Sequence, residues 1–467
     1  MTAGLPDASW PLLPSERGWS GARLLIVLTV TAAAPWFFII GGAIGLYLDL
    51  PMGTAAMLAG GLIGMGIVTL AVVPMATRYG IDSVAGAVPQ FGTRGVVLVI
   101  IPQYLSILGW NATLLVFFGD NIAKLAELAG LRTATGAAIV PIATALACVL
   151  CYPVLRFGAA GIERVCRSLV LLIAGVGVWL IWLLVGEHSE AIAKAKPILA
   201  SPDLWWNYAV GIEISIATSL SWWAYLGAIV RHTDRPSRAI LPSMLGLGLT
   251  LPLLSIIGLA SQLALGTTDA SGWLATFGGP AYGAIALTLV ALSNFGTVLA
   301  GAYAAALGLK QVPGVGRIGW NALILASLIP LLILSTTFAD AVKAHFTTFL
   351  AFIGLAFGPI CGVQIADYLL LRRQRLSLTG IYDRGSGTPY HFWHGLNPAA
   401  ALALAAGCGA YLAILNPLTF ATAPMFVWTT ASLPAVAVAG LVHASLTWLL
   451  VRPAGLGDYP GPDRPKA

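Results

Sequence analysis

Charged residues are scarce in this sequence. Only 9% of the 467 residues are Asp, Glu, Lys or Arg, whereas 58% are hydrophobic. Soluble domains carry about 25% charged residues, so this chain lacks the polar side chains needed to cover a surface that faces water. The scarcity excludes a soluble enzyme and a soluble nucleic-acid-binding protein, although the net charge is +6. The apolar residues form long runs, and runs of about 18 or more are typical of membrane-spanning helices.

Cysteine and histidine are also rare, with five and six copies. Cys148 and Cys151 form a CxxC pair inside an apolar run, without a second CxxC, which favours helix packing over a metal or redox site. An intramembrane enzyme needs several catalytic side chains at one depth, and a channel usually shows a repeated filter or a charged ring. The sequence shows neither pattern, so a transporter is the expected class.

Twelve apolar segments are long enough to be membrane spans. Lipid cannot satisfy open backbone groups, so each segment is expected to be helical, and the fold class is an all-α integral membrane protein. The expected spans are residues 24–48, 53–77, 96–118, 134–154, 166–186, 207–230, 239–266, 280–309, 319–337, 346–371, 398–415 and 426–451.

Lysine and arginine give the expected orientation. With the N-terminus inside, 19 of the 24 Lys and Arg residues fall in inside segments and 5 fall outside. Cytoplasmic loops carry an excess of these residues. The sequence therefore predicts a multi-pass protein of the cell membrane with both termini in the cytoplasm, and a wrong span count would scramble this asymmetry.

Spans 1–5 and 6–10 can form a 5+5 inverted repeat, because an odd number of spans makes the second copy run in the opposite direction. Spans 11 and 12 then follow the repeat as two additional C-terminal helices. This division predicts a cytoplasmic segment 1–23, a first repeat 24–186, a second repeat 207–371, two spans within 398–451 and a cytoplasmic tail 452–467.

Transporters built from such repeats bind substrate where helices are broken. In span 1, Pro35 removes a backbone donor, and Gly41, Gly42 and Gly45 relax the chain. In span 6, the hydroxyl-rich run 218–221 could satisfy the backbone groups of an opened helix. We expect a break in each of these two spans.

Three residues in spans 3 and 6 are candidate substrate contacts. Glu213 lies in span 6, about 9 Å outward of its middle, where a carboxylate could hold a cation, accept a proton or accept hydrogen bonds from a heterocycle. Trp110 lies near the middle of span 3, where its indole could stack on a flat ring, and the amide of Asn111 could read the ring edge.

Span 8 carries a second group of polar side chains. Ser293 and Thr297 are four residues apart and share a helix face, and Asn294 follows Ser293. Hydroxyl oxygens together with the freed carbonyls of a broken helix are suitable ligands for a hard cation such as sodium. We expect a coupling-cation site here, with Asn294 near the substrate.

Several motifs occur in a fixed order along the chain. They are Leu13–Trp19 before span 1, Thr77–Asp82 and Gln90–Gly95 after span 2, Gly109–Trp110 in span 3, Pro359–Tyr368 at the end of span 10 and Gly395–Pro398 before span 11. This ordered set resembles the purine/cytosine permease family, the nucleobase–cation symporters. The segment from Glu213 to Trp222 is also similar to a branch of the family linked to hydroxymethylpyrimidine and related substrates.

The resemblance implies twelve helices with the 5+5 inverted repeat of sodium-coupled amino-acid transporters, and a substrate held between spans 1, 3, 6 and 8. It implies that Trp110 stacks on the substrate ring. Ser219 stands where the second stacking aromatic residue is expected, with Trp222 nearby as a replacement, and Leu114 stands where some members place a substrate-reading glutamine.

The resemblance also implies a set of cation ligands. Ser293, Gly296 and Thr297 stand on the ligand positions of span 8, facing backbone carbonyls near Thr29 and Ala32 in span 1. Gly296 replaces a hydroxyl residue, so one side-chain ligand is missing. The coupling ion is therefore expected to be either sodium or a proton.

The sequence as a whole predicts a secondary active transporter that imports a nucleobase or a related small heterocycle by alternating access. The alternative is an amino-acid or amine transporter on the same inverted-repeat fold. The expected partners are the heterocyclic substrate and the lipid bilayer, with no nucleic acid, no obligate protein partner and no cofactor beyond a coupling ion.

Overall fold

The computed structural model describes residues 10–131, 136–156, 169–277, 279–315, 318–383 and 385–460. Predictions for residues 1–9 and 461–467, for the start of the fifth span at 166–168, and for the basic residues Arg132, Arg164, Arg167, Arg317 and Arg384 lie outside these ranges. The described chain is helical, and each of the twelve expected spans coincides with a helix or a pair of helices.

The described residues of the first half of the chain form eight α-helices. They are α1 (Gly21–Ala32), α2 (Trp36–Gly45), α3 (Leu50–Tyr79), α4 (Val88–Phe91), α5 (Val97–Leu128), α6 (Gly136–Arg156), α8 (Leu169–Glu187) and α9 (Ser189–Lys194). The second half begins with α10 (Leu204–Leu220), α11 (Trp223–Val230), α12 (Ile240–Ser243) and α13 (Thr250–Leu265), with a π-helical segment at Met244–Leu249 between the last two.

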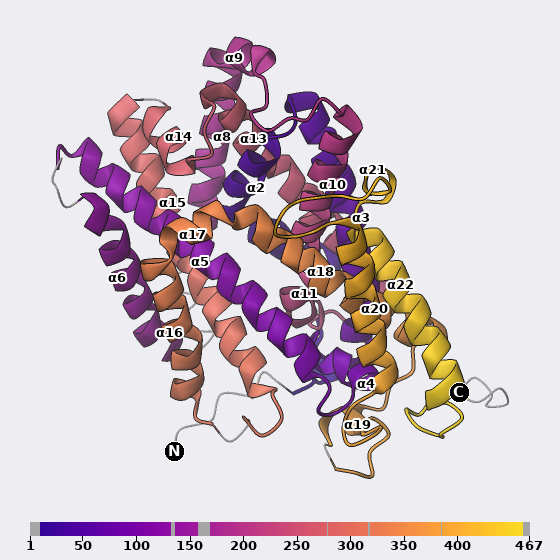
Figure 1. The fold of residues 1–467 in the computed structure, drawn as a ribbon. Coiled ribbons are helices and arrows are strands. Elements are labelled where there is room, and N and C mark those ends of the chain that lie inside the picture. Colours follow the sequence, from indigo (N-terminus) through magenta and orange to yellow (C-terminus); the bar gives the residue numbers. More distant parts are fainter. Residues whose placement is uncertain are drawn as a thin grey trace.

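The remaining helices complete the bundle. They are α14 (Ala270–Thr276), α15 (Gly279–Lys310), α16 (Trp320–Thr337), α17 (Ala339–Ala344), α18 (Phe346–Ile365), α19 (Leu378–Tyr382), α20 (Pro398–Ile414), α21 (Phe426–Thr429) and α22 (Ser432–Leu446), with π-helical ends at Ala366–Leu371 and Thr447–Val451. Figure 1 shows α20 and α22 together at one edge of the bundle, beside α18.

Among the described residues, eight helices are long and apolar enough to cross a membrane, and the bent pair α1–α2 makes a ninth. Two of the other expected spans, in α8 and α20, are shorter apolar helices, and the expected sixth span is divided between α10 and α11. The all-helical membrane fold is thus confirmed, whereas the count of twelve spans and the 5+5 repeat stay predictions.

The break expected in span 1 is present. The axes of α1 and α2 differ by 63°, and Pro35 occupies the position just before α2. Proline lacks an N–H group and cannot continue the hydrogen bonding of α1, so the chain turns here. The indole N–H of Trp36 donates to the carbonyl of Ala32, 3.3 Å away, and so satisfies a backbone group at the broken end.

The break expected in span 6 is much smaller. Ser221 and Trp222 separate α10 from α11 but keep right-handed helical backbone angles. The amide of Trp222 bonds to the carbonyl of Ser219, 3.1 Å away, as in a tighter helical turn. The hydroxyl-rich run therefore accompanies a local tightening of the helix and not an unwound segment, which corrects the prediction.

Small residues set how closely α3 and α10 approach. A methyl group added at Gly64 of α3 would lie 2.7 Å from Cβ of Ser219 and 2.8 Å from the carbonyl oxygen of Ile216. Glycine at a helix interface lets the two backbones come together, which is the usual packing of helices in lipid. The contact fixes the position of α10, which carries part of the site described next.

Candidate functional site

Three tryptophans meet where the broken first span approaches α5 and α10. The ring of Trp36 lies edge-on to Trp110, with centroids 6.0 Å apart and planes at 71°, and edge-on to Trp222 at 5.4 Å and 89°. These rings line a small cavity, called here the tryptophan pocket. Its other lining residues are Ile40, Thr218, Ser221, Tyr225 and Leu251.

The tryptophan pocket offers a few polar groups between its aromatic walls. The hydroxyl of Thr218 donates to the carbonyl of Ile214 at 2.8 Å, and that of Ser221 to the carbonyl of Thr218 at 2.6 Å. A hydroxyl that donates in this way keeps lone pairs that can accept a hydrogen bond. The indole nitrogen of Trp110 is buried and has no hydrogen-bond partner among the described atoms, so it can donate to a ligand.

A much larger cavity of about 1060 Å³, called here the vestibule, lies next to this pocket. Its walls include Phe117, Asp120, Asp269, Lys343, Phe346 and Thr347. The ring of Phe346 also packs edge-on against Trp110, with centroids 5.7 Å apart. The ring of Phe346, called here the aromatic floor, therefore lies between the vestibule and Trp110 of the tryptophan pocket.

The vestibule lies at the end of the bundle away from α4 and α19. Its residues on α5 fall in the last half of that helix, whose first residues follow α4. The other walls include the end of α2, the start of α6, the start of α14, α17 and the start of α18. The vestibule and the helices α4 and α19 thus lie at opposite ends of the bundle.

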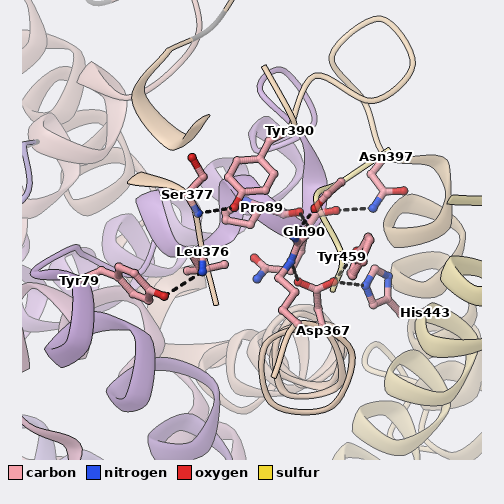
Figure 2. Close-up of polar contacts among 12 residues, drawn as sticks. Tyr79, Pro89, Gln90, Asp367, Leu376, Ser377, Tyr390, Asn397, His443 and Tyr459 are labelled. Carbon is pink, nitrogen blue, oxygen red and sulfur yellow. Dashed lines mark hydrogen bonds and ion pairs between the residues drawn. The ribbon is translucent and has the colours of Figure 1, made fainter. Parts of the chain in front are cut away.

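A buried polar cluster, called here the inner seal, lies at the opposite end of α18 from the vestibule (Figure 2). The guanidinium of Arg372 donates from Nε to Asp367 at 2.6 Å, from Nη2 to the carbonyl of Pro89 at 2.7 Å, and from Nη1 to the carbonyl of Gly457. Its carbon lies 4.1 Å from the ring centroid of Tyr459. Each guanidinium nitrogen thus has a partner.

The carboxylate of Asp367 has three donors in the same cluster. Besides Arg372, it accepts the hydroxyl of Tyr459 at 2.6 Å and pairs with Nε2 of His443 at 3.1 Å. Arg372, Asp367 and His443 are fully buried. Burial raises the pKa of Tyr459, so its hydroxyl stays protonated and can donate. The inner seal joins the end of α18, the helix α22 and the chain that follows α22.

The N-terminal segment covers the same end. The ring of Trp19 stacks on His232, with centroids 4.7 Å apart, and its amide donates to the carbonyl of His232 at 3.0 Å. The guanidinium carbon of Arg23 lies over the ring of Trp19, 4.7 Å from the ring centroid. The segment therefore fastens the start of α1 to the loop after α11.

The structure brings some of the predicted substrate residues together and separates others. Trp110 and Trp222 both line the tryptophan pocket. Asn111 packs against Gly301 of α15, where an added methyl group would meet its amide oxygen at 2.1 Å. Leu114 lies in an apolar cluster with residues of α6, α15 and α16, and the hydroxyl of Ser219 points to the carbonyl of Gly61 on α3, 3.3 Å away.

Glu213 has a separate environment. Its Oε2 accepts the amides of Ala431 and Ser432, both at 3.1 Å, and its Oε1 accepts the hydroxyl of Ser432 at 2.7 Å. These donors form the N-terminus of α22. The carboxylate thus lies outside the tryptophan pocket, although the same helix carries Thr218.

The predicted cation ligands already have partners. The carbonyl of Thr29 accepts the amide of Ala33 at 3.1 Å, and that of Ala32 accepts the indole of Trp36. The hydroxyl of Thr297 donates to the carbonyl of Ser293, 2.9 Å away, within α15. Gly296 and Ser293 are buried in α15.

Asn294 is fully buried, and neither amide atom has a hydrogen-bond partner among the described atoms. An unpaired buried amide is costly, so water or a ligand group is expected to meet it.

Sequence reasoning misses three residues of these sites. Trp36 directly follows Pro35 at the break, and a large aromatic residue at a helix break is a signal for a residue that lines the binding site. His443 lies within the last expected span, where an ionisable residue is unusual. Tyr459 stands in the tail, and no pattern in the sequence connects it with Asp367.

The family described as a permease for cytosine/purines, uracil, thiamine, allantoin matches residues 11–433 of this chain. The chain belongs to this family. It is therefore a membrane transporter and not an enzyme. The cytosine permease of Escherichia coli (strain K12) is 25% identical over 360 residues, which are 75% of this chain and 77% of that protein. The purine-uracil permease NCS1 of Arabidopsis thaliana is 22% identical over 420 residues, 85% of this chain and 69% of that protein.

The fold is shared with a solved transporter of the nucleobase-cation-symport-1 family. Mhp1, in a closed conformation with bromovinylhydantoin bound, aligns over 96% of this chain and 96% of its own, with a TM-score of 0.76 and 19% identity. The structural likeness supports the fold, and the family match supports the function class.

Proposed function

We propose that this permease imports a nucleobase or a closely related small heterocycle by alternating access, coupled to a cation gradient. The observation that carries the proposal is the tryptophan pocket beneath the vestibule. A flat ring can stack on Trp110 or Trp222, while the hydroxyls of Thr218 and Ser221 accept hydrogen bonds from ring N–H groups.

The lining of the tryptophan pocket favours a neutral ring over an amino acid. Every described residue that lines it is uncharged. A zwitterion would need partners for a carboxylate and an ammonium group, since an unpaired buried charge is very costly. The names of the relatives, which refer to cytosine, purine and uracil, are consistent with a neutral heterocycle. The alternative of an amino-acid or amine transporter is correspondingly weaker.

The tryptophan pocket has a volume of only about 10 Å³, which is too small for a nucleobase. The ring of Trp36 fills the space between the other two tryptophans. Substrate binding therefore requires Trp36 to move. In this proposal the substrate enters through the vestibule, passes the aromatic floor and replaces the contacts of Trp36.

The topology is part of the proposal. The two described chain ends lie at the same end of the bundle, because Trp10 stacks on Tyr382 and Tyr459 bonds to Asp367 at the end of α18. With the charge distribution this favours twelve spans in a 5+5 inverted repeat, both termini in the cytoplasm and a location in the cell membrane. The coupling ion is sodium or a proton.

Uptake into proteoliposomes tests the proposal. Purified protein would be reconstituted, and uptake of labelled cytosine, uracil, hypoxanthine, allantoin, hydroxymethylpyrimidine and an amino acid would be measured with sodium and proton gradients. We expect one or more heterocycles to accumulate, with competition among related rings. Accumulation of the amino acid alone would contradict the proposal and favour the alternative.

A further inference from the structure

Glu213 is a buried carboxylate without a role in the transport cycle proposed above. Its side chain is 5% exposed and lies on α10, nine residues before Trp222. Ionisable residues at membrane depth are costly and usually functional. Its surroundings indicate what that function is.

The carboxylate fastens α10 to α22. Two backbone amides and one hydroxyl, from Ala431 and Ser432, meet its two oxygens at 2.7–3.1 Å. The preceding Thr430 has φ 53°, a left-handed angle that is uncommon outside glycine. This turn directs the amides of α22 toward Glu213. A helix N-terminus favours negative charge, so the end of α22 suits a carboxylate at this position.

The remaining neighbours of Glu213 supply no opposite charge. A crevice of about 40 Å³ beside it is lined by uncharged residues from α10, α18 and the segments flanking α21. The titratable groups that face it are the phenols of Tyr47, in the crevice, and Tyr411 of α20. A methyl group at Gly354 of α18 would touch Tyr411, Ser432 and Glu213 together. The charge of Glu213 is thus held by the N-terminus of α22.

The crevice connects Glu213 with the vestibule side. Tyr47 and Thr347 line both cavities. Trp206 closes the crevice, with its indole donating to Thr422 at 2.9 Å and its ring 6.1 Å from Tyr47. A volume of about 10–15 Å³ suffices for one water molecule, and the carboxylate and two hydroxyls would be its partners. A water molecule in the crevice would therefore lie between Glu213 and the two walls that the crevice shares with the vestibule.

We propose that Glu213 is the proton-binding site of this permease, loaded from the vestibule side, an inference that rests on the proposed function. A hydronium ion gives its proton to one carboxylate oxygen and leaves as water. A proton on Oε2 places a donor where the amides of Ala431 and Ser432 need an acceptor, which weakens the contact between α10 and α22. The weaker contact permits the rearrangement around Trp222 that encloses the substrate, and the proton later passes to water on the inner side.

The incomplete ligand set in span 1 and α15 favours a proton over sodium. The carbonyl of Ala32 and the hydroxyl of Thr297 each have one hydrogen-bond partner and keep a lone pair, but they lack a further side-chain oxygen beside them. Gly296 supplies no side-chain oxygen. A proton needs a single acceptor, which Glu213 provides.

The experiment measures nucleobase uptake into proteoliposomes as a function of external pH, with and without a sodium gradient. In the wild type we expect accumulation that rises as external pH falls and does not need sodium. Glu213→Gln, which mimics the protonated side chain, is expected to abolish pH-driven accumulation and flatten the pH profile. Exchange of labelled for unlabelled substrate, which needs no net proton movement, should stay within about threefold of wild type.

Ser432→Ala is the second variant, because it removes one donor to the ionised carboxylate but keeps the carboxylate itself. Losing a hydrogen bond to a charged group is expected to move the midpoint of the pH profile upward by about one pH unit. Glu190→Gln, an exposed glutamate on α9, is the matched control and should change neither profile.

Normal pH-driven accumulation by Glu213→Gln, or an unshifted midpoint in Ser432→Ala, would overturn the proposal. Accumulation that depends on sodium alone would also overturn it. Failure of the proposed function itself looks different, because the wild type would then accumulate no nucleobase under any gradient.

Discussion

The hydroxyl of Tyr459 donates to the carboxylate of Asp367 at 2.6 Å and so ties the C-terminal tail to the end of α18. The carbonyl of Gly457 reaches the same cluster through Arg372. The tail is thus part of the inner seal. Any movement that opens this end of the molecule has to separate Tyr459 from Asp367.

Tyr459→Phe is expected to weaken the inner seal. The substitution removes one of the three donors to a buried carboxylate, a loss of about 1–3 kcal/mol. We expect a lower melting temperature in detergent. Tyr282→Phe, at an exposed tyrosine, is the control. An unchanged melting temperature in Tyr459→Phe would show that the hydroxyl is dispensable.

Trp110→Ala and Trp222→Ala are expected to weaken substrate binding. Stacking of a base on an aromatic side chain contributes about 1–3 kcal/mol, so the dissociation constant should rise roughly 10- to 100-fold. Thermal-shift titration with the transported nucleobase would measure it. Trp205→Ala, at an exposed tryptophan, should bind as the wild type does. Near-normal affinity in both pocket variants would exclude the stacking role.

Gly64→Ala is expected to destabilise the protein through the contact between α3 and α10. The added methyl group would lie 2.7 Å from Cβ of Ser219, and such overpacking costs about 1–3 kcal/mol. Gly66→Ala is the matched control, since its methyl group would meet only Met244 at 3.9 Å. We expect a lower melting temperature for Gly64→Ala alone, and equal melting temperatures would contradict the packing argument.

The sequence predicts the helices well because hydrophobic length is a strong local signal. The expected span 280–309, for example, is α15 at Gly279–Lys310. It also predicts the break at Pro35, since the loss of a backbone donor is local to that residue. The break in span 6 was overestimated, because the hydroxyls of Thr218 and Ser221 bond to their own helix and leave the backbone nearly regular.

The site was predictable only in part. Trp110 and Trp222 lie in the tryptophan pocket, as their residue type and depth suggest. The orientation of Ser219 and Leu114 depends on which neighbour each helix face meets, and hydropathy contains no such information. Ala431, which donates to Glu213, lies 218 residues further along the chain. A single sequence therefore indicates that a carboxylate in this span is energetically costly, but it does not indicate which residues bind the carboxylate.

Acid pH is expected to loosen the N-terminal segment. Burial, together with the positive charges of Arg231 and Arg23, lowers the pKa of His232 from its usual 6.5. The docked segment thus binds a proton less readily than the free one. Above about pH 6.5 both forms are neutral and docking is unaffected, whereas below it the free form gains the proton first and docking weakens.

Limited proteolysis of this segment at pH 5.5 and 7.5 checks the expectation. Cleavage near Trp19 should be faster at pH 5.5 in the wild type. His232→Asn should remove the difference, whereas His394→Asn, at an exposed histidine, should keep it. A pH dependence that persists in His232→Asn would assign the effect to another group.

The hydrogen bond from Trp36 to Ala32 has a consequence for the unloaded carrier. After a symporter releases its substrate, it must change back to its starting conformation with an empty binding site. Since Trp36 fills the space between Trp110 and Trp222 and bonds to the Ala32 carbonyl at the broken end of α1, the empty protein has neither a ring-sized void nor a bare Ala32 carbonyl here. The Trp36 side chain thus takes the place of the substrate in the empty transporter, and it allows the conformational change back to the starting state without bound substrate.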